Sequence, residues 1–284
     1  MILSELAKTN SYTNFNPALV SACCTAESVK VQLSATNVVN ALVDNKERPV
    51  LLEQLCQIYQ NIFTEYRKSR TDALAKQFND IRKKLRGYFD GMLSQHGYKL
   101  NSFADLEGFF KDKEIFSDEE FFPAIYLYMQ ANFESIDIDD TKNNRNYPAE
   151  AVFSRKEMDC DDASFFVMHF AVQRGLAEGS SCEWLLKGPE PVPEPDIHVI
   201  YLYKRKDGYI RIDNWKYDLS PVQSKKDLMR SDKFDYVYAA RTLKNPLELA
   251  RKFTYETYSS VDYLYGKSYQ ENQKYFYYIR TRDK

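Results

Sequence analysis

The segment Met158-Asp-Cys-Asp-Asp-Ala-Ser164 decides how this chain is expected to fold. Asp159 suits the N-cap of a helix, and acidic residues directly after Cys160 suit its first turn. Gly175 is placed to end that helix. In between, apolar residues recur at helical spacing, namely Ala163, Phe166, Val167, Phe170 and Ala171. The segment therefore predicts a cysteine in the first turn of a buried helix.

The pattern beyond Gly175 is typical of strands. Four runs rich in β-branched and aromatic residues cover 182–187, 197–204, 209–213 and 234–240. Lys206-Asp207-Gly208 predicts the turn between the middle two runs. If Lys204 faces Tyr209 across that turn, His198 and Asp213 project from the same sheet face as diagonal neighbours.

The residues before the cysteine segment are expected to be helical. Two amphipathic stripes, over 51–66 and 74–92, predict an αα-hairpin, and a further helix is expected over 118–133 with Pro123 in its first turn. Helices first and antiparallel strands later favour the α+β class. The expected division is a helical N-terminal region over 1–115, a core over 116–245 and a Tyr-rich C-terminal tail over 246–284.

Composition narrows the function classes. The 284 residues carry 39 basic and 41 acidic side chains, well mixed, with a net charge of −2. This balance argues against nucleic acid or an anionic membrane as the main partner. No segment resembles a signal peptide or a transmembrane helix, so a cytoplasmic location is expected. The five cysteines, an odd number in irregular positions, suggest reduced thiols.

The chemistry depends on three side chains that lie far apart in the chain. A helix N-terminus favours a thiolate at Cys160, an imidazole accepts the thiol proton, and a carboxylate fixes the imidazole tautomer. Of the three histidines, His96 is expected to cap or lie at the surface near a helix end. His169 falls on the opposite face of the helix that begins at Cys160. His198 is therefore the candidate base, with Asp213 as its carboxylate partner.

The alternative interpretation is that Cys160 is only a small buried residue. Three neighbouring carboxylates make a poor setting for an inert apolar side chain, yet nearby negative charge also raises the pKa of a thiol. For catalysis, Asp159, Asp161 and Asp162 must point away from the sulfur, or a cation or basic side chain must neutralise them.

These motifs, in this order, resemble the transglutaminase-like cysteine-protease superfamily, in particular its bacterial cysteine-proteinase members. The resemblance covers about 121–240 and includes the segment from Tyr147-Pro148 to Ala163, then His198-Val-Ile, then Asp207-Gly208-Tyr-Ile-Arg-Ile-Asp213. It implies a papain/transglutaminase-like core, in which a nucleophile helix packs on an antiparallel sheet, with an N-terminal helical extension. The sequence departs from the family in having Met158 where members usually have glycine, and in the Pro-rich insert before His198.

The resemblance implies Cys160 as nucleophile, His198 as general base and acid, and Asp213 as the orienting carboxylate. An oxyanion hole would combine the Cys160 backbone N–H with one more donor, for which Gln130 and Asn132 are candidates by position. The interpretation that both are solvated helix residues is preferred. Related bacterial proteases bind Ca²⁺ near this motif, which makes Asp159, Asp161 and Asp162 calcium candidates. The simpler interpretation, acidic residues at a helix start, is preferred, and no metal or other cofactor is expected.

Two functions follow from the sequence. The first is a cysteine-dependent acyl-transfer enzyme, a peptide or amide hydrolase or a transglutaminase, with a peptide or protein substrate. The second is a structural or assembly protein of a large complex, such as a phage or viral particle, that keeps a transglutaminase-like fold for docking. If the chain is viral, the second interpretation would place it in the virion.

Overall fold

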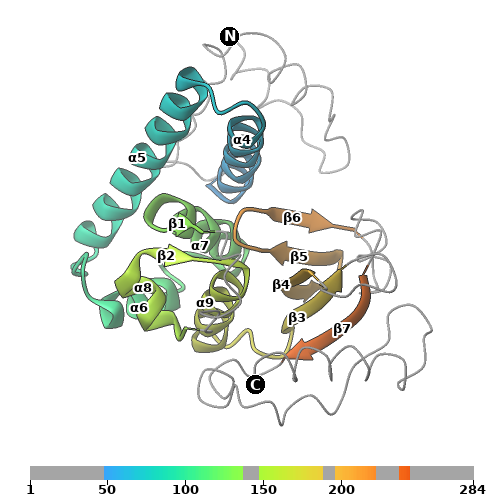
Figure 1. Ribbon diagram of the computed structural model, residues 1–284. Helices are drawn as coiled ribbons and strands as arrows, with labels where there is room; N and C mark the ends of the chain where they lie inside the picture. Colours follow the sequence, from blue (N-terminus) through green and yellow to red (C-terminus); the bar gives the residue numbers. More distant parts are fainter. Residues whose placement is uncertain (1–47, 137–146, 188–195, 222–236, 244–284) are drawn as a thin grey trace, which may run out of the picture.

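A computed structural model describes residues 48–136, 147–187, 196–221 and 237–243. Within these ranges the chain forms helices and an antiparallel sheet, which agrees with the predicted mixture of α and β structure. In Figure 1 the helices lie on one side of the molecule and the sheet on the other, with α9 beside the sheet.

Six helices are described, and each is longer than one turn. They are α4 (Arg48–Ser69), α5 (Asp72–Gln95), α6 (Phe103–Lys111), α7 (Asp118–Asn132), α8 (Ala149–Arg155) and α9 (Cys160–Gln173). The predicted hairpin, the helix expected over 118–133 and the cysteine helix itself are all confirmed. The sequence analysis did not predict α6, whose nine residues are too few for a clear periodic pattern.

Local capping explains where most of these helices begin. Side-chain oxygens of Thr71, Ser102 and Asp159 accept a hydrogen bond from a backbone N–H in the first turn of α5, α6 and α9. Glycines in a left-handed conformation follow two of the helix ends, with φ of 80° at Gly97 after α5 and 84° at Gly175 after α9. A residue with a Cβ would be strained at both positions.

The position of Pro123 differs from the prediction. Ser117 and Glu120 form a capping box, so α7 begins at Asp118 and Pro123 falls in the second turn instead of the first. Proline has no N–H to donate to the carbonyl four residues earlier. Tertiary packing compensates, because α7 is buried along nearly its whole length.

The sheet has five strands in the order β6-β5-β4-β3-β7, and every neighbouring pair is antiparallel. The strands are β3 (Ser180–Lys187), β4 (Asp196–Arg205), β5 (Gly208–Ile212), β6 (Tyr217–Ser220) and β7 (Val237–Leu243). Lys204 pairs with Tyr209, as predicted. The strand predicted over 234–240 matches β7 in part, and residues 234–236 lie outside the described residues. The short strand β6 was not predicted.

A second, two-stranded sheet lies at the start of α9. It joins β1 (Glu134–Ser135) and β2 (Glu157–Met158) in parallel, with Ser135 paired to Met158. Because β1 directly follows α7 and β2 directly precedes α9, this pair sets the position of the cysteine helix relative to α7.

The hydrophobic core extends from α4 to β6 without a break at residue 116. Its central element is α7, which contacts α4, α5 and α9 and is buried from Glu120 to Ala131. The opposite side of α9 packs on β3 and β4. The helices before residue 116 therefore share one core with the sheet.

Candidate functional site

Hydrogen bonds join the N-terminal part of helix α9 to strand β4. The Ser164 hydroxyl lies 2.7 Å from the carbonyl oxygen of Cys160 and 3.2 Å from that of Val199. The backbone of Val199 also forms a hydrogen bond with the Cys160 sulfur, an interaction that favours the thiolate. The thiol is therefore held at the residue that directly follows His198. The Cys160 side chain is partly buried.

The imidazole of His198 contacts the carboxylate of Asp213. Its Nε2 atom lies 3.3 Å from Asp213 Oδ2, and both side chains are nearly shielded from solvent. This contact is the diagonal relation across β4 and β5 that the Lys204–Tyr209 pairing predicts. The structure thus brings together the predicted base and its predicted carboxylate, next to the residue that holds the thiol.

Asp213 is fully buried and has four hydrogen-bond partners. Its Oδ1 atom accepts from the backbone N–H groups of Trp215, at 3.1 Å, and Lys216, at 2.8 Å. Its Oδ2 atom faces both His198 and Nη2 of Arg211, which lies 3.2 Å away. Burial alone would raise the Asp213 pKa, but the hydrogen bond from His198 and the charge of Arg211 outweigh it and lower that pKa. Asp213 is therefore a stable carboxylate.

The surroundings of Cys160 oppose ionisation. Burial, followed by the charge of Asp161, raises the pKa of the thiol, and the charges of Asp159 and Asp213 add to the effect. The backbone hydrogen bond from Val199 acts in the opposite direction and is weaker. Without a ligand, the sulfur is therefore held as a protonated thiol.

The other two described histidines lie elsewhere. His96 is the C-cap residue of α5, and His169 Nε2 lies 2.6 Å from a carboxylate oxygen of Glu107 on α6. These positions agree with the expectation that neither His96 nor His169 acts as the base for the Cys160 thiol.

The turn after Asp213 is anchored to α7. Gln130 Nε2 donates to the carbonyl oxygen of Asn214 at 2.7 Å, and the Tyr126 hydroxyl donates to that of Trp215 at 3.0 Å. Asn214 Nδ2 in turn donates to the Ser135 hydroxyl oxygen at 3.2 Å. These bonds come from side chains of α7 and β1, so the position of the carboxylate depends on the helical half of the fold.

The two oxyanion candidates occupy different settings. Gln130 is buried and directed at the turn beside Asp213, and the second N–H of its amide is the donor that an oxyanion hole would use. Asn132 instead donates to the carbonyl oxygen of Tyr128 within its own helix, at 3.0 Å. Between the two, Gln130 is therefore the candidate whose side chain contacts the turn after Asp213.

Met158, which stands where members of the resembled superfamily usually have glycine, is fully buried in β2 directly before the N-cap residue. Its backbone is part of the short ladder with β1, and its carbonyl oxygen accepts from Ile136 N at 3.0 Å. The position thus serves as a packed strand residue.

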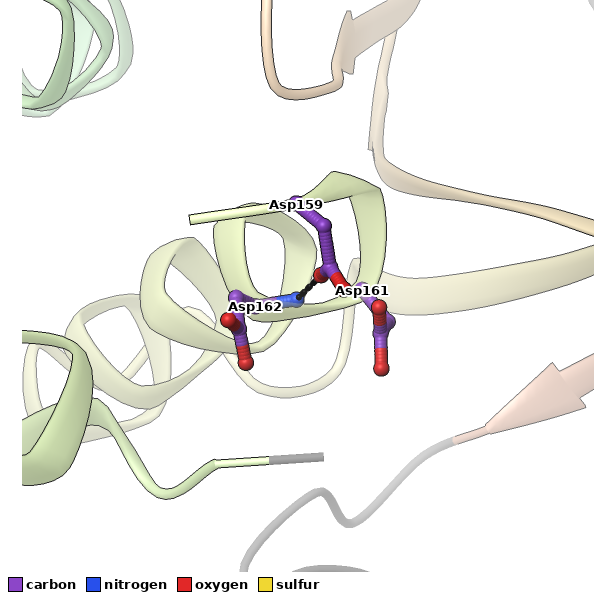
Figure 2. Close-up of side chains that lie close together, drawn as sticks. All are labelled: Asp159, Asp161 and Asp162. Carbon is purple, nitrogen blue, oxygen red and sulfur yellow. Dashed lines mark hydrogen bonds between the residues drawn. The ribbon is translucent and has the colours of Figure 1, made fainter. Parts of the chain in front are cut away.

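The three carboxylates of the cysteine segment lie together (Figure 2). One oxygen from each of Asp159, Asp161 and Asp162 falls within 4.8 Å of the others, and all three side chains are buried. Asp159 accepts a hydrogen bond from Asp162 N at 3.0 Å, which is the N-cap bond predicted from the sequence. The cluster therefore combines a helix cap with a set of oxygens of the kind that Ca²⁺ prefers.

Burial raises the pKa of two carboxyls in this cluster. Burial and then the charge of Asp159 raise the pKa of Asp162 to about 7. Burial, a hydrogen bond with Asp159 and the charges of both neighbours raise the pKa of Asp161 well above its usual value. Arg155 Nη1 lies 3.7 Å from Asp162 Oδ2, an oxygen that has no hydrogen-bond partner among the described residues. Protonation, this arginine or a bound cation would each reduce the repulsion.

The residues before α8 also contact the cluster. Tyr147 N donates to Asp162 Oδ1 at 3.1 Å, and the Arg155 guanidinium lies 3.9 Å from the centroid of the Tyr147 ring. A tyrosine and an arginine from the segment before the cysteine thus line one side of the acidic cluster.

The sequence analysis did not single out Arg211, although it touches the predicted carboxylate. The available signal is its spacing, because a charged residue two positions before Asp213 in an otherwise apolar strand shares its sheet face. Tyr126 and the backbone of Asn214 were also missed, since only the three-dimensional fold brings α7 to the turn after β5.

No protein-family model matches the chain, and no curated protein sequence shows significant similarity to it. Among the residues that the structure describes, none of the helices has the length and apolar character needed to span a bilayer.

Proposed function

We propose that the chain is a cysteine-dependent acyl-transfer enzyme built on a papain/transglutaminase-like core. The observation that carries the proposal is the contact between His198 Nε2 and Asp213 Oδ2, one residue away from the backbone that holds the Cys160 sulfur. A thiol at a helix start, a histidine on one strand and an aspartate at the end of the next are the parts of a nucleophilic triad.

In the proposed reaction, His198 takes the proton of Cys160 while the sulfur attacks the carbonyl carbon of an amide. A carbon–sulfur bond forms and the carbonyl electron pair moves to oxygen, where the Cys160 N–H and the Gln130 amide are the candidate donors. When the carbonyl re-forms, the carbon–nitrogen bond breaks and the leaving amine takes the proton from His198. Water or a second amine then attacks the thioester and restores the thiol.

Asp213 supports this cycle by orienting the imidazole. Its carboxylate stays charged, so it can accept a hydrogen bond from Nε2 and leave Nδ1 as the nitrogen that would exchange a proton with sulfur. The anchored turn over Asn214 and Trp215 limits the movement of that carboxylate.

Site-resolved alkylation of the full chain with iodoacetamide tests the proposal. We expect Cys160 to react in a manner that depends on His198, with the rate falling about 100-fold in His198→Ala, as for loss of a general base. Asp213→Asn should lower the rate while the protein remains folded. The buried thiols of Cys56 and Cys182 are internal controls and should react only on unfolding. Equal rates at Cys160 in the wild type and His198→Ala would refute the triad.

A second assay separates hydrolysis from transfer. A library of glutamine-containing peptides is incubated with a fluorescent primary amine, and mass spectrometry records whether the product gains the amine or water. Cys160→Ala is the matched negative control, because it removes the sulfur and keeps the helix. Turnover that persists in Cys160→Ala would contradict the proposal.

One observation favours the alternative, an assembly protein that keeps this fold without catalysis. The surroundings of the thiol raise its pKa, as expected for a cysteine that is not activated. In that case the Cys160→Ala variant should bind its native partners and co-elute with them as the wild type does. A monomeric protein with Cys160-dependent turnover would exclude this alternative.

A further inference from the structure

Arg211 occupies an unusual position for a charged residue. It lies in β5, where every residue is buried, and only 2% of its surface is exposed. Its side chain shares a sheet face with Asp213, two residues further along the chain. Burying a guanidinium is costly unless it is paired. Arg211 is paired with Asp213, the predicted carboxylate partner of His198.

The contact involves the same carboxylate oxygen that His198 uses. Arg211 Nη2 lies 3.2 Å from Asp213 Oδ2, and His198 Nε2 lies 3.3 Å from it. The carboxylate therefore already has a permanent positive partner, because a guanidinium does not lose its charge in proteins. A protonated imidazole would bring a second positive charge to that oxygen.

We propose that Arg211 is a positioning residue, which fixes the Asp213 carboxylate through the oxygen shared with His198 and keeps the Cys160–His198 pair uncharged until a substrate binds. This inference rests on the proposed function. A lone carboxylate would stabilise an imidazolium beside a thiolate, whereas a carboxylate that is paired with arginine does so less. The imidazole then acts as a neutral base and the thiol ionises only during attack.

The neighbouring elements also bring charged and titratable groups to this region. On the α9 side, Asp159 and Asp161 oppose a thiolate at Cys160. In the turn after β5, Lys216 adds a positive charge close enough to Arg211 that the two affect each other, and burial together with Arg211 lowers the Lys216 pKa. On α7, the facing group is Tyr126, whose pKa burial raises. Arg211 is the charge that touches the shared oxygen.

The test is the pH profile of Cys160 alkylation in the full-length wild type, Arg211→Gln and Arg211→Lys. We expect Arg211→Gln to shift the midpoint to lower pH by about one unit, because removing a nearby positive charge favours the imidazolium that accompanies a thiolate. Below the midpoint, alkylation should be about tenfold faster than in the wild type. Arg211→Lys keeps the charge and should keep the wild-type midpoint. A residue with only a structural role would change the rate without moving the midpoint.

Arg205→Gln is the matched control, because Arg205 lies at the end of β4 and pairs with exposed Asp207 at 3.0 Å. It should leave the midpoint unchanged. A folded Arg211→Gln with the wild-type midpoint would overturn the inference. If Arg211→Gln does not fold, Arg211→Lys decides, and a midpoint displaced to lower pH in that variant would equally overturn it. If wild-type alkylation does not depend on His198, the proposed function itself fails, which is a different result.

Discussion

Ser164 connects α9, which carries the predicted nucleophile, to β4, which carries the predicted base, because its hydroxyl lies 3.2 Å from the carbonyl oxygen of Val199. The same hydroxyl lies 2.7 Å from the carbonyl oxygen of Cys160, one turn earlier. A single buried side chain thus contacts both the backbone of Cys160 and the backbone of the residue that follows His198.

Removing this hydroxyl should weaken both the fold and the site. We expect Ser164→Ala to lower the free energy of unfolding by about 1–2 kcal/mol, as for loss of a buried hydrogen bond. The alkylation rate of Cys160 should also fall. The control is Ser154→Ala, since Ser154 makes the same bond to a carbonyl four residues earlier but is exposed to solvent. Urea unfolding measures both variants, and equal losses would argue against a special role for Ser164.

Tyr126 should matter through its hydroxyl group. Tyr126→Phe removes the donor to Trp215 O, so we expect a loss of about 1 kcal/mol of unfolding free energy and slower alkylation of Cys160. Tyr88→Phe is the matched control, because the buried Tyr88 hydroxyl has no hydrogen-bond partner in the part of the chain that the structure describes. Its removal should be neutral or stabilising. Thermal unfolding of the two variants side by side tests the difference.

Arg174 is expected to be essential for stability. Its guanidinium is buried after α9 and donates to the Phe110 and Phe116 carbonyl oxygens and to Asp118, which lies 3.0 Å away. Arg174→Met would leave these acceptors unpaired, so we expect a loss of about 3–5 kcal/mol. Arg205→Met, which breaks an exposed ion pair, should cost less than about 1 kcal/mol. Comparable losses in urea unfolding would contradict this assignment.

The acidic cluster predicts a particular dependence of stability on pH. The Asp162 pKa is about 7 in the folded protein against an ordinary value of 3.8, so the folded state holds a proton that the unfolded state releases. Stability from this group is complete below about pH 4 and is lost as pH rises through about 7. The difference of about 3 pH units sets an upper limit of about 4 kcal/mol.

Asp162→Asn should abolish this part of the decline, so the variant should gain stability over the wild type as pH rises from 4 to 8. Urea unfolding in EDTA measures the gain without interference from cations. Asp72→Asn, which removes an exposed first-turn carboxyl in α5, is the control and should follow the wild type. A constant difference between Asp162→Asn and the wild type across this range would refute the assignment.

The sequence predicted the local features of this protein well. The N-cap at Asp159, the glycine after α9 and the pairing of Lys204 with Tyr209 each depend on a few neighbouring residues, so their signals are complete within a short window. The His198–Asp213 contact was predictable for the same reason, because one tight turn fixes the register of β4 and β5.

The features that the sequence did not reveal depend on contacts between distant segments. Gln130 and Tyr126 meet the turn after Asp213 across more than 80 residues of chain, and no local pattern records that meeting. The position of Pro123 was predicted wrongly although the predicted start at residue 118 agrees with α7, because the sixth residue of a helix already lies in its second turn. Arg211 was overlooked because a lone arginine in a strand is usually taken as an exposed residue.

The central position of α7 has a consequence for motion. This helix is enclosed by α4, α5 and α9, and two of its side chains hold the turn that carries Asp213. Amide hydrogens of α7 should therefore exchange with solvent only when the whole protein opens, and those of the adjoining turn should exchange nearly as slowly. Heat or denaturant would then unfold the proposed triad and the core in the same cooperative event.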